Sequence, residues 1–247
     1  MDPVAGHCRE IDRCNQRGAR MLSIVDLLEA GTVTGELAAY SLAAISGGAS
    51  FMVGAVPGGA GKTTVMGALL NFVPADVELA PADGLAAVYE GLEESGIRRC
   101  YICHEIGAGP YYAYLWDEPL RRYFDLPAAG HMLATNLHAD TLGQAQDQVC
   151  STNGVEPVAF RRMNLAYFLA VEGRGWKAAR RIVTVWESNG SSDHEMVYED
   201  GRFIRPSKLV TDTALESAAE TIGRILSTGM RTIAQVRADI LAAGSCK

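Results

Sequence analysis

The sequence predicts an α/β protein with a mostly parallel sheet, a short antiparallel extension and helices at the C-terminal end. Between residues 50 and 149, short apolar runs typical of strands alternate with stretches whose apolar residues recur at helical spacing. That alternation is typical of a parallel sheet with helices on both faces. From residue 165 strand-like runs follow one another directly, which predicts antiparallel pairing. Two amphipathic patterns then close the chain.

The elements of the first part follow from spacing and from residues that stop or start helices. Gly31 ends the first helix, and Thr34 is a suitable N-cap for the second, with Glu36 in its first turn. In chain order we predict helices at 21–29 and 34–45, a strand at 50–54, a helix at 62–72, a strand at 77–80, a helix at 84–95, a strand at 100–103, an aromatic helix at 111–124, a strand at 131–137 and a helix at 141–149.

The second part reads as strands followed by helices. Strands are predicted at 165–171 and 181–187, and a hairpin joins 195–198 to 202–204. In the closing helices, apolar residues repeat at i, i+3, i+4 and i+7 and form one stripe per helix. These residues are Leu215, Ala218, Ala219, Ile222, Ile225 and Leu226 in the first helix, and Ile233, Val236, Ile240 and Leu241 in the second.

Composition limits the class of protein. The 247 residues carry a net charge of −7 with a pI of about 5.3, which argues against a nucleic-acid binder. The sequence contains no apolar run of membrane-spanning length and no secretory signal, so we expect a cytoplasmic protein. Residues 1–20 are polar and without periodicity and are predicted to be flexible. Residues 21–247 are predicted to form one core with a helical appendage at 209–245.

The six cysteines are scattered, and a reducing cytosol favours free thiols. Cys100 and Cys103 form a C-x-x-C pair in an apolar run that reads as a strand. Three positions apart on a strand, their side chains face opposite sides of the sheet. The sequence therefore does not favour a metal or redox site here.

A glycine-rich segment, GAVPGGAGKTT at 54–64, lies between a predicted strand and a predicted helix. This order is that of a phosphate-binding loop, in which glycines let successive backbone N–H groups point at phosphate oxygens and the helix directs its positive end at the same place. Lys62 would contact the β- and γ-phosphates, and the Thr63 hydroxyl would bind Mg²⁺. The predicted nucleotide-binding residues are Pro57, Gly58, Gly59, Ala60, Gly61, Lys62, Thr63 and Thr64. Val56 stands where the usual pattern has glycine, and the alternative is a glycine-rich turn that binds nothing.

Hydrolysis also needs a carboxylate near the γ-phosphate. Glu105 follows the apolar run 100–103, and ligands of such sheets sit at the carboxyl ends of the strands. Glu105 would orient or deprotonate the attacking water; the alternative is a surface glutamate at a strand end. Asp83 follows the strand at 77–80 and could hold the Mg²⁺ shell or the water, or could simply be the N-cap of the next helix.

A third polar cluster, with Thr135, Asn136 and His138, ends the strand at 131–137. A histidine at this edge could sense the γ-phosphate or couple to a neighbouring group. By itself, a single histidine is more often structural.

Together these motifs resemble the secretion ATPase superfamily, which comprises the hexameric motors of type II and type IV secretion, of type IV pilus assembly and retraction, and of the archaellum. The nearest pattern is that of the archaeal and tight-adherence pilus branch, on the stretch 25–74. GHMLATNLHADT at 130–141 resembles the family's His box, and HEIG at 104–107 its Walker B motif. The resemblance covers about residues 21–245 and is to the motor core alone.

This resemblance implies a RecA-like P-loop NTPase core that binds ATP and Mg²⁺, with Lys62, Glu105 and His138 as catalytic residues. It also implies a homo-oligomer, hexameric by analogy, that works at the inner face of the cell membrane with a membrane-embedded secretion or pilus platform. The sequence departs from the family pattern at several points: Asp83 aligns with the acidic box but its neighbours do not, Gly107 replaces an arginine, and Arg98 and Arg99 are not in the setting expected of interface arginines.

Three functions follow from these observations. The leading one is a secretion-type motor ATPase. A second is a nucleotide-dependent regulator or scaffold that hydrolyses slowly or not at all, which the missing arginines favour. A third is a small-molecule kinase, for which the two arginines of 118–122 would belong to a lid, although the His box has no role in such an enzyme.

Overall fold

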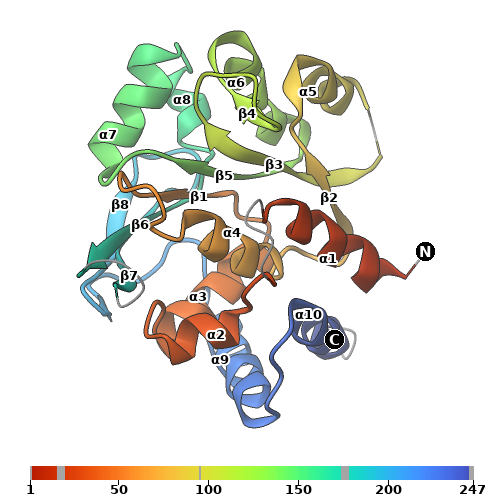
Figure 1. The fold of residues 1–247 in the computed structure, drawn as a ribbon, viewed down its shortest axis with the longest axis vertical. Helices are drawn as coiled ribbons and strands as arrows, with labels where there is room; N and C mark the ends of the chain where they lie inside the picture. Colours follow the sequence, from red (N-terminus) through yellow and green to blue (C-terminus); the bar gives the residue numbers. More distant parts are fainter. Residues whose placement is uncertain (1, 16–19, 95, 174–177, 245–247) are drawn as a thin grey trace.

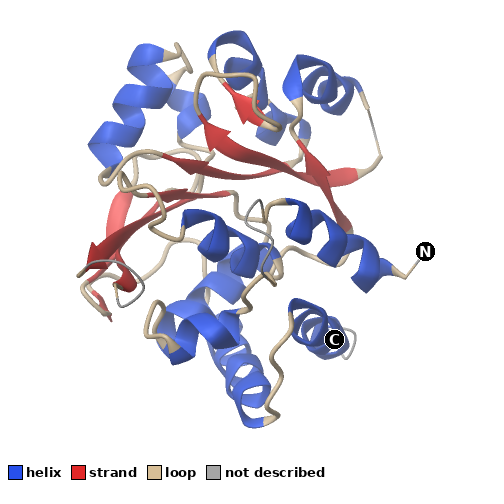
Figure 2. Cartoon of the chain, in the orientation of Figure 1, coloured by secondary structure: helices blue, strands red, loops and turns tan. Residues whose placement is uncertain are grey.

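The computed structural model describes residues 2–15, 20–94, 96–173 and 178–244. Within these residues nine strands form one sheet, which has helices on both faces (Figures 1 and 2). The α/β fold class predicted from the sequence is confirmed, including the mostly parallel sheet, the antiparallel extension and the closing helices.

The strands follow the spatial order β2-β3-β5-β1-β6-β7-β8-β9, and β4 pairs with β3. Their bounds are β1 (Phe51–Gly54), β2 (Val77–Pro81), β3 (Arg98–Ile106), β4 (Tyr114–Leu115), β5 (Met132–Leu137), β6 (Leu165–Glu172), β7 (Ala179–Glu187), β8 (Glu195–Glu199) and β9 (Arg202–Phe203). In the part of the sheet that runs from β2 to β6, neighbouring strands are parallel. From β6 to β9, neighbouring strands are antiparallel. The strand β5 thus separates β1, which leads into the glycine-rich loop, from β3, which carries Glu105.

The helices divide between the two faces (Figure 1). One face holds α5 (Gly84–Glu93), α6 (Asp117–Tyr123), the short turn η1 (Leu126–Ala129), α7 (Leu142–Gln146), the π-helical turn η2 (Asp147–Thr152) and α8 (Pro157–Phe160). The other holds α1 (Pro3–Arg13), α2 (Ile24–Glu29), α3 (Gly35–Ser46) and α4 (Lys62–Leu70), with α9 (Asp212–Ser227) against α3 and α10 (Ile233–Gly244) against α1. Each face has its own apolar core.

The predicted opposition of Cys100 and Cys103 is confirmed. Both are fully buried, Cys100 in the core beneath α4 and Cys103 in the core on the other face of the sheet. Burial raises the pKa of the Cys103 thiol to about 12, so this thiol stays protonated. The cysteines of the described residues are free.

Residues 3–13 lie in the stretch 1–20 that was predicted to be flexible, and no helix was expected there. They form helix α1, whose N-cap Asp2 accepts a hydrogen bond from the Val4 N–H and whose inner face buries His7, Cys8 and Ile11. Val4, Cys8 and Ile11 recur at i, i+4 and i+7, so the helix has an apolar stripe that the sequence prediction missed; the stripe is short and includes the polar His7. Residues 16–19, also in that prediction, lie outside the described part of the chain.

The helix predicted at 111–124 is wrong in its first half. Helix α6 begins only at Asp117, while Tyr114 and Leu115 form strand β4. The backbone here pairs with β3, since the His104 N–H donates to the Ala113 carbonyl and the Gly107 N–H to the Leu115 carbonyl. This pairing also extends β3 through Glu105, which was expected just beyond the end of the strand.

The C-terminal end of α4 is held by the two terminal helices. The buried Arg237 of α10 donates to the carbonyls of Asn71 at 2.9 Å, Val73 and Pro74 at 3.3 Å. His7 of α1 lies with its Nε2 3.0 Å from the Leu70 carbonyl. The last carbonyls of a helix lack partners within the helix, and a cation there complements the helix dipole. The terminal helices therefore fix the rear of the helix that follows the glycine-rich loop.

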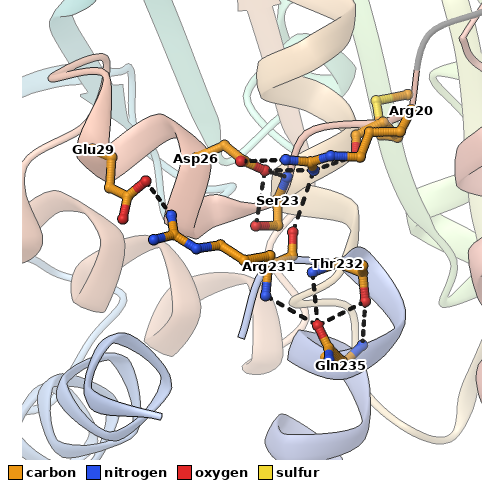
Figure 3. A network of polar contacts seen from close by, with 8 residues as sticks. Arg20, Ser23, Asp26, Glu29, Arg231, Thr232 and Gln235 are labelled. Carbon is orange, nitrogen blue, oxygen red and sulfur yellow. Dashed lines mark hydrogen bonds and ion pairs between the residues drawn. The ribbon is translucent and has the colours of Figure 1, made fainter. Parts of the chain in front are cut away.

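A second polar network joins the turn between α9 and α10 to α2 (Figure 3). Arg20 donates to both carboxylate oxygens of Asp26, at 2.8 and 2.6 Å, and to the Arg231 carbonyl at 3.3 Å. Arg231 pairs in turn with Glu29, and the Gln235 side chain accepts the Arg231 N–H. The C-terminal helices are thus fastened to the segment that leads into α2.

Replacement of Arg237 by methionine should lower the free energy of unfolding by about 2–4 kcal/mol, because the carbonyls of Asn71 and Val73, just after α4, lose this buried donor. Arg224→Met is the matched control, since Arg224 is 42% exposed and pairs with Asp239 at the surface; its cost should stay within about 1 kcal/mol. Urea unfolding followed by circular dichroism measures both. Equal losses in the two variants would contradict the buried role.

Acid should weaken the protein through His7. Burial and the nearby Arg237 lower the pKa of His7 from its ordinary 6.5 to about 3. Between these values the unfolded chain binds a proton that the folded chain does not, so stability falls as pH drops from 6.5 towards 3. The slope from this group is at most about 1.4 kcal/mol per pH unit. Urea unfolding as a function of pH should give a shallower dependence for His7→Gln than for the wild type, and parallel curves would contradict the assignment.

Candidate functional site

The carboxyl ends of β1, β3 and β5 meet at one edge of the sheet, beside the N-terminus of α4. A cavity of about 550 Å³ opens there. Its lining includes residues of the glycine-rich loop, the start of α4, β3, β4, the segment after β5, and β7: Gly58, Gly59, Ala60, Gly61, Lys62, Thr63, Thr64, His104, Glu105, Tyr114, His138 and Arg180. Of the predicted nucleotide-binding residues, Pro57 is exposed and is not among those that line this cavity.

The loop has the backbone conformation that its glycines predict. Gly59 and Gly61 have φ of +81° and +96°, in the left-handed region that other residues rarely adopt. Gly61 is the N-cap of α4, so the chain passes directly from this conformation into the helix. The unpaired N–H groups at the start of α4 and its positive dipole end therefore lie at the cavity, where they favour an anion.

His138 and Asp140, which follow β5, hold the start of the glycine-rich loop. The Val56 N–H donates to Asp140 Oδ1 at 2.7 Å, and the Val56 carbonyl lies 3.1 Å from His138 Nδ1. The Val56 side chain is 47% exposed, and Val56 is not among the non-glycine residues with positive φ. A valine is therefore accommodated where the usual loop has glycine, since neither crowding nor backbone conformation requires a glycine there.

Lys62 lies at the centre of the site and is buried. Its Nζ lies 3.3 Å from the Ala55 carbonyl, 3.5 Å from Glu105 Oε2 and 3.4 Å from His138 Nδ1. The three residues predicted to be catalytic, from α4, from β3 and from the loop after β5, are thus brought together around one point. The His138 side chain is 54% exposed and its Nε2 lies 3.9 Å from Glu105 Oε2.

Glu105 is a buried carboxylate with an unused oxygen. Burial raises its pKa, while the charge of Lys62 and the neighbouring His138 oppose that rise. Within the described chain, Glu105 Oε1 has no hydrogen-bond partner, and the same holds for the buried His104 Nδ1 and Asn136 Oδ1. Buried polar atoms are normally paired. Of these three residues, Glu105 and His104 line the cavity, and their unpaired atoms fit a site that receives a polar ligand and water.

His104 is a site residue that the sequence reasoning did not single out. It lines the cavity next to Glu105, although neighbours on a regular strand face opposite ways. The pairing of β3 with β5 shifts register between Cys103 and Ile106, which breaks the alternation. The His104 ring packs edge-on against Tyr112. Burial lowers the pKa of His104, and the charge of Asp83 opposes this shift. No signal in the sequence indicates this shift of register.

Asp83 does not cap helix α5 with its side chain. Its Oδ1 instead accepts the Ala113 N–H at 3.1 Å, which holds the loop that follows β3. Asp83 is not among the cavity-lining residues, and the described chain contains no cluster of three or more His, Cys, Asp or Glu side chains suited to a metal ion. Its role toward Mg²⁺, like that of Thr63, stays a prediction.

Asn136 ties β5 to β3, whereas the hydrogen bond of the Thr135 side chain stays within β5. Asn136 Nδ2 donates to the His104 carbonyl at 2.9 Å, and the Thr135 hydroxyl donates to the Asn136 carbonyl at 3.2 Å. Of the polar cluster after β5, His138 therefore reaches the site directly, while Asn136 positions the β3 backbone that carries His104 and Glu105.

No protein-family model matches the chain, and no curated protein matches it. Among solved structures, it is similar to the VirB11 ATPase of the Brucella suis type IV secretion system, with a TM-score of 0.43 and 17% identity over 66% of this chain and 54% of that one. It is also similar to the ATPase DotB of Legionella pneumophila, with a TM-score of 0.39 and 7% identity over 93% of this chain and 61% of that one. The chain therefore spans less than two thirds of the length of either.

Lys62 and Glu105 should be energetically coupled. Lys62→Met leaves a buried carboxylate without its counter-charge, and Glu105→Gln leaves the buried ammonium without its own, but the double variant leaves neither. Urea unfolding without nucleotide should show that the double variant loses less free energy than the sum of the single losses, by about 1–3 kcal/mol. Additive losses would contradict a direct contact.

Proposed function

We propose that this chain binds MgATP in the cavity and hydrolyses it, as a motor ATPase of the secretion and pilus-assembly type. The observation that carries the proposal is the meeting of Lys62, Glu105 and His138, all within 3.9 Å of a neighbour in the group, at the mouth of a glycine-rich loop. The unpaired Oε1 of Glu105 beside it offers an acceptor for a water molecule.

Nucleotide binding rests on the loop and on α4. The N–H groups of residues 58–64 would hold the β-phosphate, and Lys62 would reach the β- and γ-oxygens. The Thr63 hydroxyl would contact Mg²⁺, with Asp83 near its water shell. When bound, Mg²⁺ neutralises charge on the β- and γ-oxygens and on the leaving group. The cavity, at about 550 Å³, falls within the usual range of small-molecule sites.

Glu105 would act as the general base in hydrolysis. Without nucleotide, Lys62 lies 3.5 Å from Glu105 and partly neutralises it. Bound phosphates would draw the ammonium toward themselves, and the desolvated carboxylate would then be the stronger base. Glu105 would take a proton from the attacking water as its oxygen bonds to the γ-phosphorus and the bond to the β-phosphate oxygen breaks. The products are ADP and phosphate.

His138 would link the γ-phosphate to the loop. It lies between the Val56 carbonyl and Glu105, at 3.1 Å and 3.9 Å. A γ-phosphate that attracts the imidazole would therefore loosen its contact with Val56, and loss of the phosphate would restore it. This arrangement supports a role for His138 in sensing the state of the nucleotide.

The assembly is proposed by resemblance: a homo-oligomer, a hexamer by analogy, on a membrane-embedded secretion or pilus platform, without nucleic acid. No helix in the described ranges is long and apolar enough to cross a membrane. Arg98 and Arg99 lie at the start of β3, away from the site, where Arg98 pairs with Asp76 and Arg99 with Glu94. Since an arginine supplied to the γ-phosphate can be worth orders of magnitude in rate, their engagement favours a slower ATPase or a nucleotide-dependent regulator as the second candidate.

Phosphate release from MgATP over a range of protein concentrations tests the proposal. Release per subunit should rise with concentration if subunits complete one another's sites. Lys62→Ala should weaken MgATP binding by roughly 10- to 100-fold. Glu105→Gln should bind MgATP normally but release phosphate at least roughly 100-fold more slowly. Lys208→Ala, a lysine paired with Glu195 at the surface, is the control and should leave both unchanged.

Tight MgATP binding without phosphate release in the wild type would reject hydrolysis and leave the regulator. Absence of nucleotide binding would reject the whole proposal.

A further inference from the structure

Arg180 lies over the glycine-rich loop from the flank opposite Glu105. Its Nε donates to the Gly59 carbonyl at 3.1 Å, and its Nη1 donates to the Ala178 carbonyl at 3.0 Å. Its Cδ lies 3.3 Å from the point that a Cβ on Gly61 would occupy, so a side chain at that position would press on the arginine. The arginine is half-buried and lines the same cavity as Lys62.

The next residue in β7, Arg181, has a carboxylate partner. Arg181 is 51% exposed and pairs with Glu172, with 2.5 Å between Nη2 and Oε1. The hydrogen bonds of Arg180 to Gly59 and Ala178 go to neutral carbonyl oxygens instead, so they do not balance its charge. A guanidinium has five N–H donors in a planar fork that suits phosphate oxygens. Arg180 is therefore a cation that faces a cavity already suited to anions.

The order of the strands decides which phosphates Arg180 would face. The strands β5 and β3, which lead to His138 and Glu105, lie on one side of β1, whereas β6 and β7 lie on the other. If Glu105 acts on the water that attacks the γ-phosphate, the γ-phosphate lies toward β3. A triphosphate wrapped by the loop then presents its α- and β-phosphates toward β7, where Arg180 lies.

We propose that Arg180 is a binding residue for the α- and β-phosphates of the nucleotide, which its guanidinium contacts after it exchanges the Gly59 carbonyl for phosphate oxygens. This inference rests on the proposed nucleotide binding. It adds a second cation to Lys62, from the opposite flank of the loop. Because ADP keeps both phosphates, Arg180 holds substrate and product alike and acts on affinity.

Titration calorimetry with MgADP, MgATP and inorganic tripolyphosphate tests this assignment. Arg180→Ala should weaken all three ligands by a similar factor, roughly 10-fold or more, because a charge-assisted bond to phosphate is lost. Arg180→Gln, which keeps a donor for the Gly59 carbonyl but no charge, should bind as weakly as Arg180→Ala. Arg180→Lys should recover most of the affinity. Arg181→Ala is the matched control and should bind like the wild type.

Three results would overturn the proposal while nucleotide binding stands. Affinity of Arg180→Gln equal to that of the wild type would show that Arg180 serves only to brace the loop. Affinity of Arg180→Ala equal to that of Arg181→Ala would show no contact with phosphate. A loss confined to MgATP, with MgADP unaffected, would place the contact at the γ-phosphate. A wild type that binds none of the ligands would instead reject the proposed function itself, and circular dichroism of each variant establishes that it is folded.

Discussion

The site depends on where strand β1 ends. β1 is buried along its whole length and is hydrogen-bonded in parallel to β5 on one side and to β6 on the other. A Cβ on Gly54, its last residue, would lie 2.5 Å from the Ala139 carbonyl and 2.7 Å from the Phe168 ring, so only glycine fits between these neighbours. The chain therefore leaves the sheet in a fixed direction at its carboxyl edge, and the loop, α4 and Lys62 follow from that exit.

Helix α4 is fixed at both ends, which makes its N-terminus a rigid base for the loop. At the front, the loop carbonyls and N–H groups contact Asp140, His138 and Arg180. At the rear, helices from the two ends of the chain supply His7 and Arg237 to carbonyls that the helix itself leaves unpaired. Because these contacts hold α4 at both ends, we expect any adjustment on ligand binding to fall mainly to side chains such as Lys62 and Arg180.

The sequence predicts those parts of the fold that depend on local patterns of residues. Alternating strands and helices, the loop kernel and the cluster around His138 are all visible in the chain, and they suffice to bring Lys62, Glu105 and His138 to one edge of the sheet. Helix α1 was missed because its apolar stripe is short, and strand β4 and the position of His104 are not visible. Each depends on a partner distant in sequence: α10 for α1, the β3 backbone for β4, and the irregular register with β5 for His104. The role of Arg180 is also not visible in the sequence. Its neighbour Arg181 is the same residue type but does not line the cavity.

The charges around the loop suit the site to an anion, and without one the two buried charges offset each other in part. A buried ammonium and a buried carboxylate each cost several kcal/mol by themselves, but Lys62 and Glu105 lie 3.5 Å apart and compensate one another. Under the proposed function, a bound phosphate would compete with Glu105 for Lys62, which would separate the pair and leave Glu105 with a higher affinity for protons. Phosphate binding and the generation of a base would then be a single electrostatic event. By the same reasoning, a group that does not draw Lys62 away would not activate Glu105, so the proposed hydrolysis would depend on occupancy of the loop by phosphate.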